Sequence, residues 1–566
     1  MALLKKNDKK PPLTVRWRTG AVGSGKRPHQ IEKPAPCRTH CPIGSDMRGA
    51  LSLIARRDRF GLSEPEAFDT AWRLVVETNP LPAVLGRVCP SPCEENCNRR
   101  EKDEAVALGA LERFLGDWGI ERGLALDRIP GVARSLKSVA VVGAGPGGLS
   151  CAYQLARRGH DVTIYEGHPE AGGMLRYGVP SYRLSRATLD AEVHRILSLG
   201  VSFKPSVRVG SDVPFEELRR GHDAVFMAIG AHRGRGLALR DHHDGDVLSG
   251  IEFLRRVNSS APPQVVEPVV VVGDGETAID VARVANRLAR SSGPSGGVAP
   301  AISLLRAHRQ DEADLSALLE EGIDVVYGVM PTGVQRGETG GVVAIETQPA
   351  RLGDPGPDGL RLPVPLSGDA RVFAASTIIA AVSQVPDWDG LGAFEGAGRI
   401  DVDEWGRTHV EGVWSGGDSV VLGIVAESVG QGLRAAQSID ASLRGFTLAP
   451  PSRRQPVSTG RVKLRLYDAK PRSSEHRLTP WESLHNPLAE IEQGVSRQQV
   501  TYEASRCLGC GTCIGCERCW LYCTPGCFAR TPNPAPGAPA FSLALAKCDG
   551  CNKCADECPT GFIEMV

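Results

Sequence analysis

The chain of 566 residues is too long for one hydrophobic core, and its length predicts roughly three or four domains. Its 66 basic and 66 acidic side chains balance, so no overall charge favours nucleic acid or an anionic membrane surface as a partner. No run approaches the roughly 18 consecutive apolar residues of a membrane span, and the first residues lack the apolar core of a secretory signal. We therefore expect a cytoplasmic protein without a membrane span.

The N-terminal part of the chain predicts a tail and a helical domain. Residues 1–30 are basic and have no apolar period, so we expect a disordered tail. Residues 31–135 show helical periodicity from Met47 to Val76, between two groups of cysteines. In a reducing compartment such groups are typical of metal ligands, and Cys-Pro steps without histidines at ligand spacing favour an iron–sulfur site over zinc. The cysteines are Cys37, Cys41, Cys89, Cys93 and Cys97.

Residues 137–166 have the order of elements that binds a dinucleotide. A buried strand, Val139 to Val142, is followed by glycines, a helical pattern and a second strand that ends in Glu166. In this fingerprint Gly143 makes the tight turn, Gly145 lets the backbone approach a pyrophosphate, and Gly148 packs the helix on the strand. Glu166 would accept a hydrogen bond from a ribose. An isolated glycine pattern also occurs in ordinary turns, but here every element follows at the expected offset.

A second fingerprint follows a glycine-rich turn at residues 172–184. Its strand, Val269 to Val272, leads into Gly273, Gly275, Ala278 and a helix. Two dinucleotide folds imply two nucleotides, one of them compatible with the ADP half of a flavin. The next strand ends in Arg306, Ala307, His308 and Arg309. An acidic residue there would favour NAD and a pair of arginines would favour NADP, so this segment leaves the nicotinamide undecided.

Further along, Gly417 and Asp418 precede a long amphipathic helix. The carboxylate of Asp418 either accepts a hydrogen bond from a cofactor hydroxyl or caps that helix. Residues 444–500 are rich in Pro, Arg and Ser and have weak periodicity, which predicts a linker on the surface.

The C-terminal residues 501–566 contain two CxxCxxCxxxC runs, a pattern typical of two-cluster ferredoxins. In those proteins the fourth cysteine of each run binds the other cluster, whereas a zinc ribbon would use two well-separated CxxC pairs. The spacing thus groups Cys513, Cys516 and Cys519 with Cys558, and Cys548, Cys551 and Cys554 with Cys523. An alternative register that begins at Cys507 lacks the step to a fourth cysteine. Four cysteines are not assigned to a cluster: Cys507, Cys510, Cys527 and Cys151, of which Cys151 is expected to be a core thiol.

Several segments together resemble the glutamate synthase small-subunit family of iron–sulfur flavoproteins, from about Cys37 to Asp440. These segments are GRVCPSPCE, VAVVGAGPGGL, GGMLRYGVPSYRL, VVVVGDGETAID and GGD. The resemblance implies an α/β fold with two Rossmann-like domains, in which an NAD(P)H domain (259–372) interrupts an FAD domain (136–258 and 373–443). A helical iron–sulfur domain would precede them, and an α+β ferredoxin-like domain would follow.

The same resemblance implies the cofactor contacts. FAD would lie on Gly143, Gly145, Gly148, Glu166 and Asp418, with Gly173, Met174, Leu175, Tyr177 and Gly178 over the flavin. NAD(P)H would lie on Gly273, Gly275, Ala278, Arg306 and Arg309.

The chain departs from this family at two places. The family usually has a CxxC upstream of Cys37, and here His29 and Glu32 stand in those positions. The resemblance therefore implies one N-terminal [4Fe–4S] cluster, held by Cys41, Cys89, Cys93 and Glu112, with Cys37 and Cys97 as remnants of the other. Glu112 as an ordinary acid on a helix surface is the alternative. The second departure is Ala307 where the family has a second arginine, which favours NADH slightly.

We expect an NAD(P)H:acceptor oxidoreductase that exchanges electrons between nicotinamide and iron–sulfur carriers in either direction. A flavin belongs between them because hydride carries two electrons and a cluster exchanges one at a time. This chemistry needs no acid–base triad, and no catalytic residue is assigned. The expected partner is another redox subunit or a ferredoxin. The alternatives are the glutamate synthase small subunit itself and a scaffold that holds clusters without turning over nicotinamide.

Overall fold

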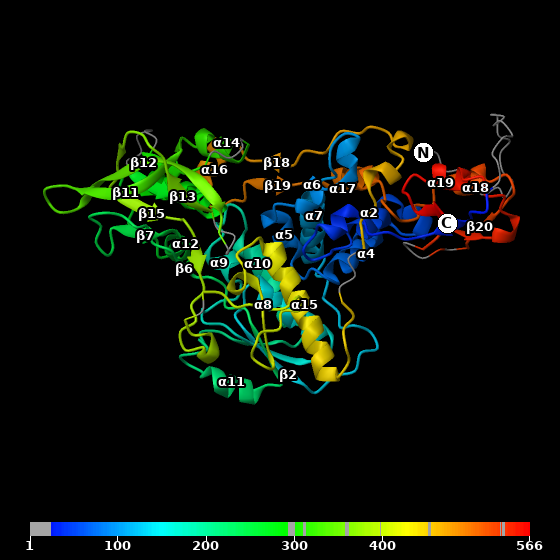
Figure 1. Cartoon of the computed structure of the whole chain (residues 1–566), viewed down its shortest axis with the longest axis horizontal. Coiled ribbons are helices and arrows are strands. Elements are labelled where there is room, and N and C mark those ends of the chain that lie inside the picture. Colours follow the sequence, from blue (N-terminus) through cyan, green and yellow to red (C-terminus); the bar gives the residue numbers. More distant parts are fainter. Residues whose placement is uncertain are drawn as a thin grey trace.

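The computed structural model describes residues 24–292, 300–308, 313–356, 361–396, 398–450, 454–532, 534 and 538–566. The molecule is elongated, as Figure 1 shows. The second dinucleotide domain lies at one end of the long axis and the cysteine-rich C-terminal module at the other. The N-terminal helices lie between them, and the first dinucleotide domain projects from the middle. The α/β fold class with two Rossmann-like domains is confirmed.

The first dinucleotide domain is built on a parallel sheet of order β17-β5-β2-β3-β4. Its central strand is buried because Val139, Ala140 and Val141 are covered on both faces. Helices α8 and α15 pack together on it, although β17 and α15 come from a part of the chain beyond the second domain. The elements are β2 (Ser138–Val142), α8 (Pro146–Arg157), β3 (Asp161–Tyr165), α9 (Met174–Tyr177), α10 (Arg186–Leu197), β4 (Ser202–Lys204), α11 (Phe215–Gly221), β5 (Ala224–Met227), η2 (Gly392–Phe394), β17 (Val413–Ser415), η3 (Gly417–Ser419) and α15 (Val425–Arg444).

The second dinucleotide domain has a parallel sheet of order β10-β9-β8-β15-β7. A four-stranded antiparallel sheet, in which β12 pairs with β11, β13 and β14, is inserted before β15. The elements are β7 (Val247–Ser249), α12 (Gly250–Asn258), β8 (Val269–Val272), α13 (Glu276–Ser292), β9 (Ile302–Arg306), α14 (Ala313–Glu320), β10 (Asp324–Tyr327), β11 (Val329–Arg336), β12 (Val342–Pro355), β13 (Arg361–Pro365), β14 (Arg371–Ala374) and β15 (Thr377–Ala380).

The limits of this insertion differ from the expected 259–372. Strand β7 begins at Val247 and β15 ends at Ala380, yet both belong to the second sheet because β15 pairs with β8 and β7. Two short strands, β6 (Arg233–Gly234) and β16 (Gln384–Val385), pair where the chain enters and leaves the insertion. The inserted domain therefore runs from about residue 235 to about 383.

The N-terminal domain is helical, as expected, and its core is completed by a helix from far along the chain. Val500 and Ala504 of α17 are buried among the apolar side chains of α2, α4 and α7. The elements are α1 (Pro36–Thr39), α2 (Met47–Ala55), α3 (Arg57–Phe60), α4 (Glu64–Val76), α5 (Pro82–Val88), α6 (Pro92–Glu95), η1 (Asn98–Glu101), α7 (Leu108–Glu121) and α17 (Arg497–Arg506).

The expected linker at 444–500 contains short helices and strands, and hydrogen bonds hold it against the domains that it passes. Glu490 accepts hydrogen bonds from Arg87 at 2.9 Å and Arg113 at 2.8 Å, and also from the backbone N–H of Ser185. This carboxylate thereby joins the helical domain to the first dinucleotide domain. The elements are η4 (Thr459–Arg461), η5 (Leu464–Leu466), β18 (His476–Arg477), α16 (Pro480–His485) and β19 (Glu492–Gly494).

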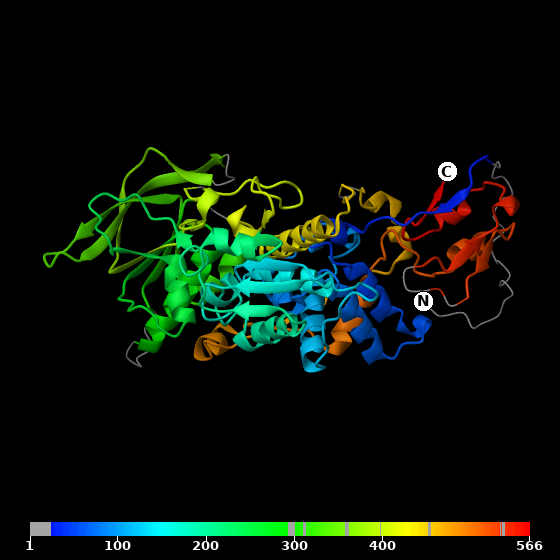
Figure 2. The same ribbon diagram turned by 90° about the horizontal axis from the view of Figure 1, so that it is seen from below.

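The C-terminal module pairs with the beginning of the described chain. Strand β1 (Pro28–Gln30) is antiparallel to β22 (Ile563–Met565), and Figure 2 shows the blue β1 segment beside the red C-terminal module. Part of the expected tail is therefore a strand, while residues 1–23 lie outside the described part. The module also contains α18 (Arg518–Tyr522), β20 (Phe528–Arg530), β21 (Phe541–Leu543), η6 (Leu545–Lys547) and α19 (Lys553–Asp556). Within the described ranges, no helix has the length and apolarity needed to cross a membrane.

Candidate functional site

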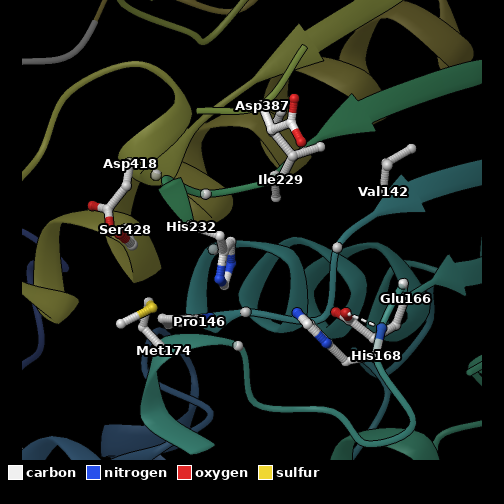
Figure 3. A pocket seen from close by; sticks show the side chains of 18 of the residues that line it. Val142, Pro146, Glu166, His168, Met174, Ile229, His232, Asp387, Asp418 and Ser428 are labelled. Atoms are coloured by element: carbon white, nitrogen blue, oxygen red, sulfur yellow. Dashed lines mark hydrogen bonds between the residues drawn. The ribbon is translucent and has the colours of Figure 1, made fainter. Parts of the chain in front are cut away.

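A cavity of about 330 Å³ opens above the glycine loop of the first dinucleotide domain (Figure 3). Two of the loop's glycines are required by close backbone contacts. A Cβ atom on Gly143, whose φ is +99°, would lie 2.4 Å from the carbonyl oxygen of Ala228. A Cβ atom on Gly148 would lie 2.0 Å from the carbonyl oxygen of Gly143. Gly145 instead has open space on the cavity side, so the N-terminus of α8 faces the cavity and can receive an anion such as a pyrophosphate.

Glu166 lies on one side of this cavity and holds the glycine loop in place. Its carboxylate accepts hydrogen bonds from the backbone N–H of Ala144 at 2.7 Å and of His168 at 2.9 Å. An ionised carboxylate has about four acceptor positions, so two remain for a ligand hydroxyl. Glu166 can thus bind a ribose and shape the loop at the same time.

Asp418 lines the cavity across from Glu166 in the view of Figure 3. Burial raises the pKa of its carboxyl to about 6, although the N–H of Gly423 and the nearby Arg399 favour its charged form. Asp418 does not cap the long helix: the N-cap of α15 is Ile424, whose N–H donates to Glu427 at 3.1 Å. The side chain is thus available to a cofactor.

The glycine-rich turn that was expected over the flavin forms the short helix α9 at the cavity mouth. Gly173, Met174 and Leu175 line the cavity. A Cβ atom on Gly173 would lie 2.7 Å from the Cα atom of Gly145, so the two loops touch through their backbones. Tyr177 instead packs against His168, with ring centroids 4.5 Å apart, and Gly178 packs against the methyl group of Met174.

The second glycine loop joins β8 to α13. A Cβ atom on Gly273 would lie 2.4 Å from the carbonyl oxygen of Ala381, whereas one on Gly275 would meet no atom within 4 Å. Ala278 is fully buried under the loop. This combination of a packed turn and an open second glycine leaves room for a pyrophosphate at the helix N-terminus.

Arg306 lies under this loop, inside the domain. Its side chain is 0% exposed and donates a hydrogen bond to the carbonyl oxygen of Asp274. The carboxylate of Asp274 accepts from the backbone N–H of His308 at 3.0 Å, so the loop and the end of β9 are tied together. Arg309 lies outside the described residues.

A group of three thiols and one carboxyl group lies between the helical domain and the first dinucleotide domain. It consists of Cys41, Cys89, Cys93 and Glu112, and we call it the flavin-side set. Cys41 and Cys89 pack against the core of the dinucleotide domain. Glu112 of α7 is buried, which raises its pKa to about 7, and it accepts a hydrogen bond from Asn79 at 2.9 Å. This acid lies near all three thiols, in the place where the resemblance puts a non-cysteine ligand.

The eight cysteines of the two C-terminal runs surround two separate hollows. The first ferredoxin set is Cys513, Cys516, Cys519 and Cys558. The second ferredoxin set is Cys523, Cys548, Cys551 and Cys554, with Cys527 beside it. The fourth cysteine of each run therefore lies with the other run, as the spacing predicted.

Cys37 and Cys97, expected to be remnants, lie beside two cysteines that sequence reasoning left unassigned. Burial raises the pKa of Cys37 well above its usual value, and so do the neighbouring thiols of Cys507, Cys510 and Cys97. The CxxC spacing of Cys507 and Cys510 was a visible signal, but nothing local indicated its partners. In the part of the chain that the structure describes, no group of three or more His, Cys, Asp or Glu side chains is close enough to hold a single metal ion.

Comparisons with known proteins agree with this arrangement. Residues 137–438 match the family model described as pyridine nucleotide-disulphide oxidoreductase. The chain belongs to this family. In this oxidoreductase, residues 17–124 also match dihydropyrimidine dehydrogenase domain II, 4Fe-4S cluster, and residues 545–564 match the 4Fe-4S binding domain. The iron–sulfur flavoprotein resemblance is therefore confirmed.

Curated relatives of this oxidoreductase are subunits of redox enzymes. The beta subunit of NADP(+)-dependent formate dehydrogenase from Moorella thermoacetica is 34% identical, over 84% of this chain and 70% of that protein. The beta subunit of NADPH-Fe(3+) oxidoreductase from Geobacter sulfurreducens is 32% identical, over 84% of this chain and 75% of that protein. The glutamate synthase [NADPH] small chain of Escherichia coli is 29% identical, over 71% and 87%.

These matches confirm FAD, NAD(P)H and [4Fe–4S] clusters as the cofactors. The protein is an FAD-dependent NAD(P)H oxidoreductase that carries iron–sulfur clusters. The residues present fit these groups: two glycine loops leave open space at a helix N-terminus, and thiols are gathered around hollows in the C-terminal module.

Proposed function

We propose that this chain is the electron-transfer subunit of a larger redox complex. It would exchange electrons with NAD(P)H at its second dinucleotide domain and with a partner protein at its C-terminal module. The observation that carries this proposal is the succession of sites along the molecule. The flavin cavity adjoins the flavin-side set, and the ferredoxin sets lie at the far end from the nicotinamide loop (Figure 1).

The residues of the two glycine loops would bind the pyrophosphates, and Glu166 and Asp418 would orient the flavin nucleotide by its hydroxyls. Bound FAD would supply a carrier that takes two electrons with a hydride and gives them up one at a time. No proton has to be moved by an acid–base side chain, so the chain's task is to position the nucleotides and to shield the cavity. Leu175, which is fully buried, and Met174 close the cavity on the α9 side.

The contacts of helix α15 support electron transfer between the flavin cavity and the flavin-side set. Helix α15 lines the cavity with Val425 and Ser428 and touches the loop after Cys41 with Gly430. Arg434 of the same helix donates to the carbonyl oxygen of Pro42 at 3.4 Å. One helix thus lines the cavity and also contacts the loop that follows Cys41 of the flavin-side set.

The expected partner is a further redox subunit or a ferredoxin, in agreement with relatives that are named as beta subunits. A ferredoxin module at the end of an elongated molecule is accessible to such a partner. The many reduced thiols suit the cytoplasm, and electrons could flow in either direction.

For the nicotinamide, we infer a preference for NADH. A 2′-phosphate is bound best by a bidentate arginine on the surface. Here Ala307 replaces a second arginine, and Arg306 is enclosed by the loop that it supports.

The test is anaerobic mixing of the cluster-loaded protein with NADH and, separately, with NADPH, while flavin and cluster absorbance is followed. Faster bleaching of both chromophores by NADH is the expected result. Faster bleaching by NADPH would overturn the nicotinamide preference and leave the electron-transfer role intact. Absence of bleaching with either nucleotide in FAD-loaded protein would overturn the role itself.

A further inference from the structure

We propose that Cys37, Cys97, Cys507 and Cys510 together hold a further [4Fe–4S] cluster, to which each end of the chain contributes two thiolates. We call these four residues the middle set. The N-terminal domain lacks the upstream CxxC that would complete its own site, and the segment after α17 brings a CxxC to the same place.

The four thiols are neighbours in the structure. Cys37 faces Cys97, Cys507 and Cys510, and Cys510 also faces Cys97 and Cys507. Cys37, Cys97 and Cys507 pack against the same helical core, which contains Val500 and Ala504 of α17. Because this core fixes α17 against α2, the turn that follows α17 has a defined position next to α1.

The turn Cys507–Cys510 is held by hydrogen bonds to its carbonyl oxygens. Arg99 donates to the carbonyl oxygen of Arg506, and Tyr467 donates to that of Leu508 at 2.6 Å. Arg48 donates to the carbonyl oxygen of Cys510 at 2.9 Å and, with the same nitrogen, to that of Lys33 at 2.9 Å.

With these carbonyl groups held by donors, the N–H groups of the turn are free to point at sulfur. The N–H of Gly509 donates to the thiol of Cys507, and the amide of Asn98 donates to the sulfur of Cys510 at 3.6 Å. Hydrogen bonds of this kind to ligand sulfurs are a common feature of iron–sulfur loops and tune their potential.

The charges around the middle set suit an anionic cluster. Buried thiols resist ionisation unless a metal or a cation is near. Arg48 is a cation near Cys37, and both Arg56 and Arg48 are near Cys507. Arg48 is itself buried, and its guanidinium bridges the carboxylate of Glu32 and the carbonyl oxygen of Cys510.

The spacing of the thiols favours a cube of four irons over a single zinc ion. No described group of potential ligands is tight enough for one ion, and this holds equally for the two ferredoxin sets. A cube is several ångströms across and takes its thiolates at wider spacing than a tetrahedral ion does.

The middle set lies between the other sets. Cys37 is a neighbour of Cys93 in the flavin-side set. On its other side, the partly buried Tyr467 lies near Cys507, Cys510 and also Cys516 of the first ferredoxin set. A cluster here would complete a relay in which single electrons pass between the flavin-side set and the ferredoxin sets, with no bond formed or broken. This role rests on the proposed function, whereas the cluster itself does not.

The test counts metal and sulfide per FAD in full-length protein reconstituted anaerobically with iron and sulfide. Four cubes correspond to about 16 iron atoms per chain. We compare the double variants Cys37→Ser/Cys97→Ser and Cys507→Ser/Cys510→Ser with the quadruple variant. Each double variant should lose about four iron atoms. The quadruple variant should also lose only about four, because all four thiols bind one cluster. Cys151→Ala, a buried thiol of α8 away from every set, is the control and should lose none.

Iron losses that add to about eight in the quadruple variant would overturn the shared site, and so would an unchanged count in the Cys507→Ser/Cys510→Ser variant. One zinc ion per chain that disappears in these variants would overturn the cluster in favour of zinc. If the variants do not fold, as judged by their FAD content, the unmodified protein decides: about 16 iron atoms support the proposal and about 12 contradict it.

The relay role has a separate readout. In the Cys507→Ser/Cys510→Ser variant, NAD(P)H should still bleach the flavin at the normal rate, while bleaching of the ferredoxin sets should slow by about 100-fold or more. Unchanged bleaching of those sets would overturn the relay role even if the iron count supports the cluster. Failure of the flavin to bleach in the unmodified protein would instead count against the proposed function.

Discussion

Gly430 of helix α15 lies against the carbonyl oxygen of Pro42, so closely that a Cβ atom at position 430 would be 2.3 Å from that oxygen. Pro42 follows Cys41, a member of the flavin-side set, and α15 lines the flavin cavity. The absence of a side chain at residue 430 therefore lets helix α15 touch the loop that carries Cys41, a proposed cluster ligand.

We expect Gly430→Ala to push these two elements apart. The added methyl group meets backbone, which cannot move as a side chain could, so the cost is about 1–3 kcal/mol of stability. Electron flow from flavin to clusters should slow by about 10-fold, while reduction of the flavin by NAD(P)H should not change. Stopped-flow absorbance separates the two rates. Ser442→Ala, at an exposed position on the same helix, is the control. Equal rates in both variants would show that this contact is unimportant.

The two glycine loops should respond differently to a methyl group. Gly143→Ala forces a strained φ and a clash with Ala228, so we expect protein that is purified with little FAD. Gly275→Ala meets no protein atom and only fills the space for a pyrophosphate. We expect normal FAD content and a KM for the nicotinamide raised about 10-fold. Loss of FAD in Gly275→Ala would contradict the assignment of the two loops.

Arg306→Ala should weaken both nicotinamides alike. Because the side chain supports the loop at Asp274 and does not reach the surface, its loss should raise the KM for NADH and for NADPH by similar factors, within about 2-fold of one another. Steady-state kinetics with both nucleotides measure this ratio. Arg351→Ala removes an exposed arginine of the same domain and should change neither value. A selective loss of NADPH activity would mean that Arg306 binds the 2′-phosphate.

Glu192 should make the protein less stable as the pH rises from about 4.5 to 7. This acid of α10 is fully buried and accepts from the N–H groups of Ala83 and Val84 at 3.0 Å. Burial raises its pKa to about 7, although Arg195 and both N–H groups favour the charged form. The folded state then keeps a proton that the unfolded chain releases, so stability falls across this range by at most about 3 kcal/mol.

The check is the difference in melting temperature between Glu192→Gln and the unmodified protein. Gln does not titrate, so the difference should move in favour of the variant from pH 4.5 to 7 and then remain constant. A difference that moves in favour of the unmodified protein would mean that the two N–H groups and Arg195 outweigh burial.

Deletion of residues 1–31 should loosen the C-terminal module. It removes β1 and leaves the edge of β22 unpaired, including the bond from Ile31 N–H to the carbonyl oxygen of Phe562 at 2.9 Å. We expect iron of the ferredoxin sets to be lost to a chelator about 10-fold faster, with FAD retained. Deletion of residues 1–23 keeps β1 and serves as the control. Equal rates of iron loss would contradict a stabilising role for the strand.

Much of the fold was predictable because its signals are local. A strand, a glycine turn and a helix lie within about 20 residues at each dinucleotide loop, and the C-terminal cysteine runs have a spacing that indicates their exchange of ligands. The domain limits were less accurate, because the pairing of β7 and β15 with β8 depends on contacts between distant segments.

The middle set shows most clearly which contacts could not be predicted from the sequence. Cys37 and Cys507 are separated by 470 positions, and no periodicity or motif relates them. Similarly, the burial of Arg306 under the Asp274 loop was not visible in a sequence that places it at the end of a strand. Which distant segments meet is decided by packing of the whole domain, here by Val500 and Ala504 in the helical core.

The meeting of the two chain ends fixes the order in which the protein can be assembled. At roughly 5–20 residues per second, a ribosome needs about 25–95 s to travel from Cys37 to Cys507. During that time Cys37 and Cys97 have been made, but their proposed co-ligands have not. Strand β22, with which β1 pairs, has not been made either. If the middle set holds a cluster, iron can be bound there only after residues 507–510 have been made, so a polypeptide that ends before them cannot hold this proposed cluster.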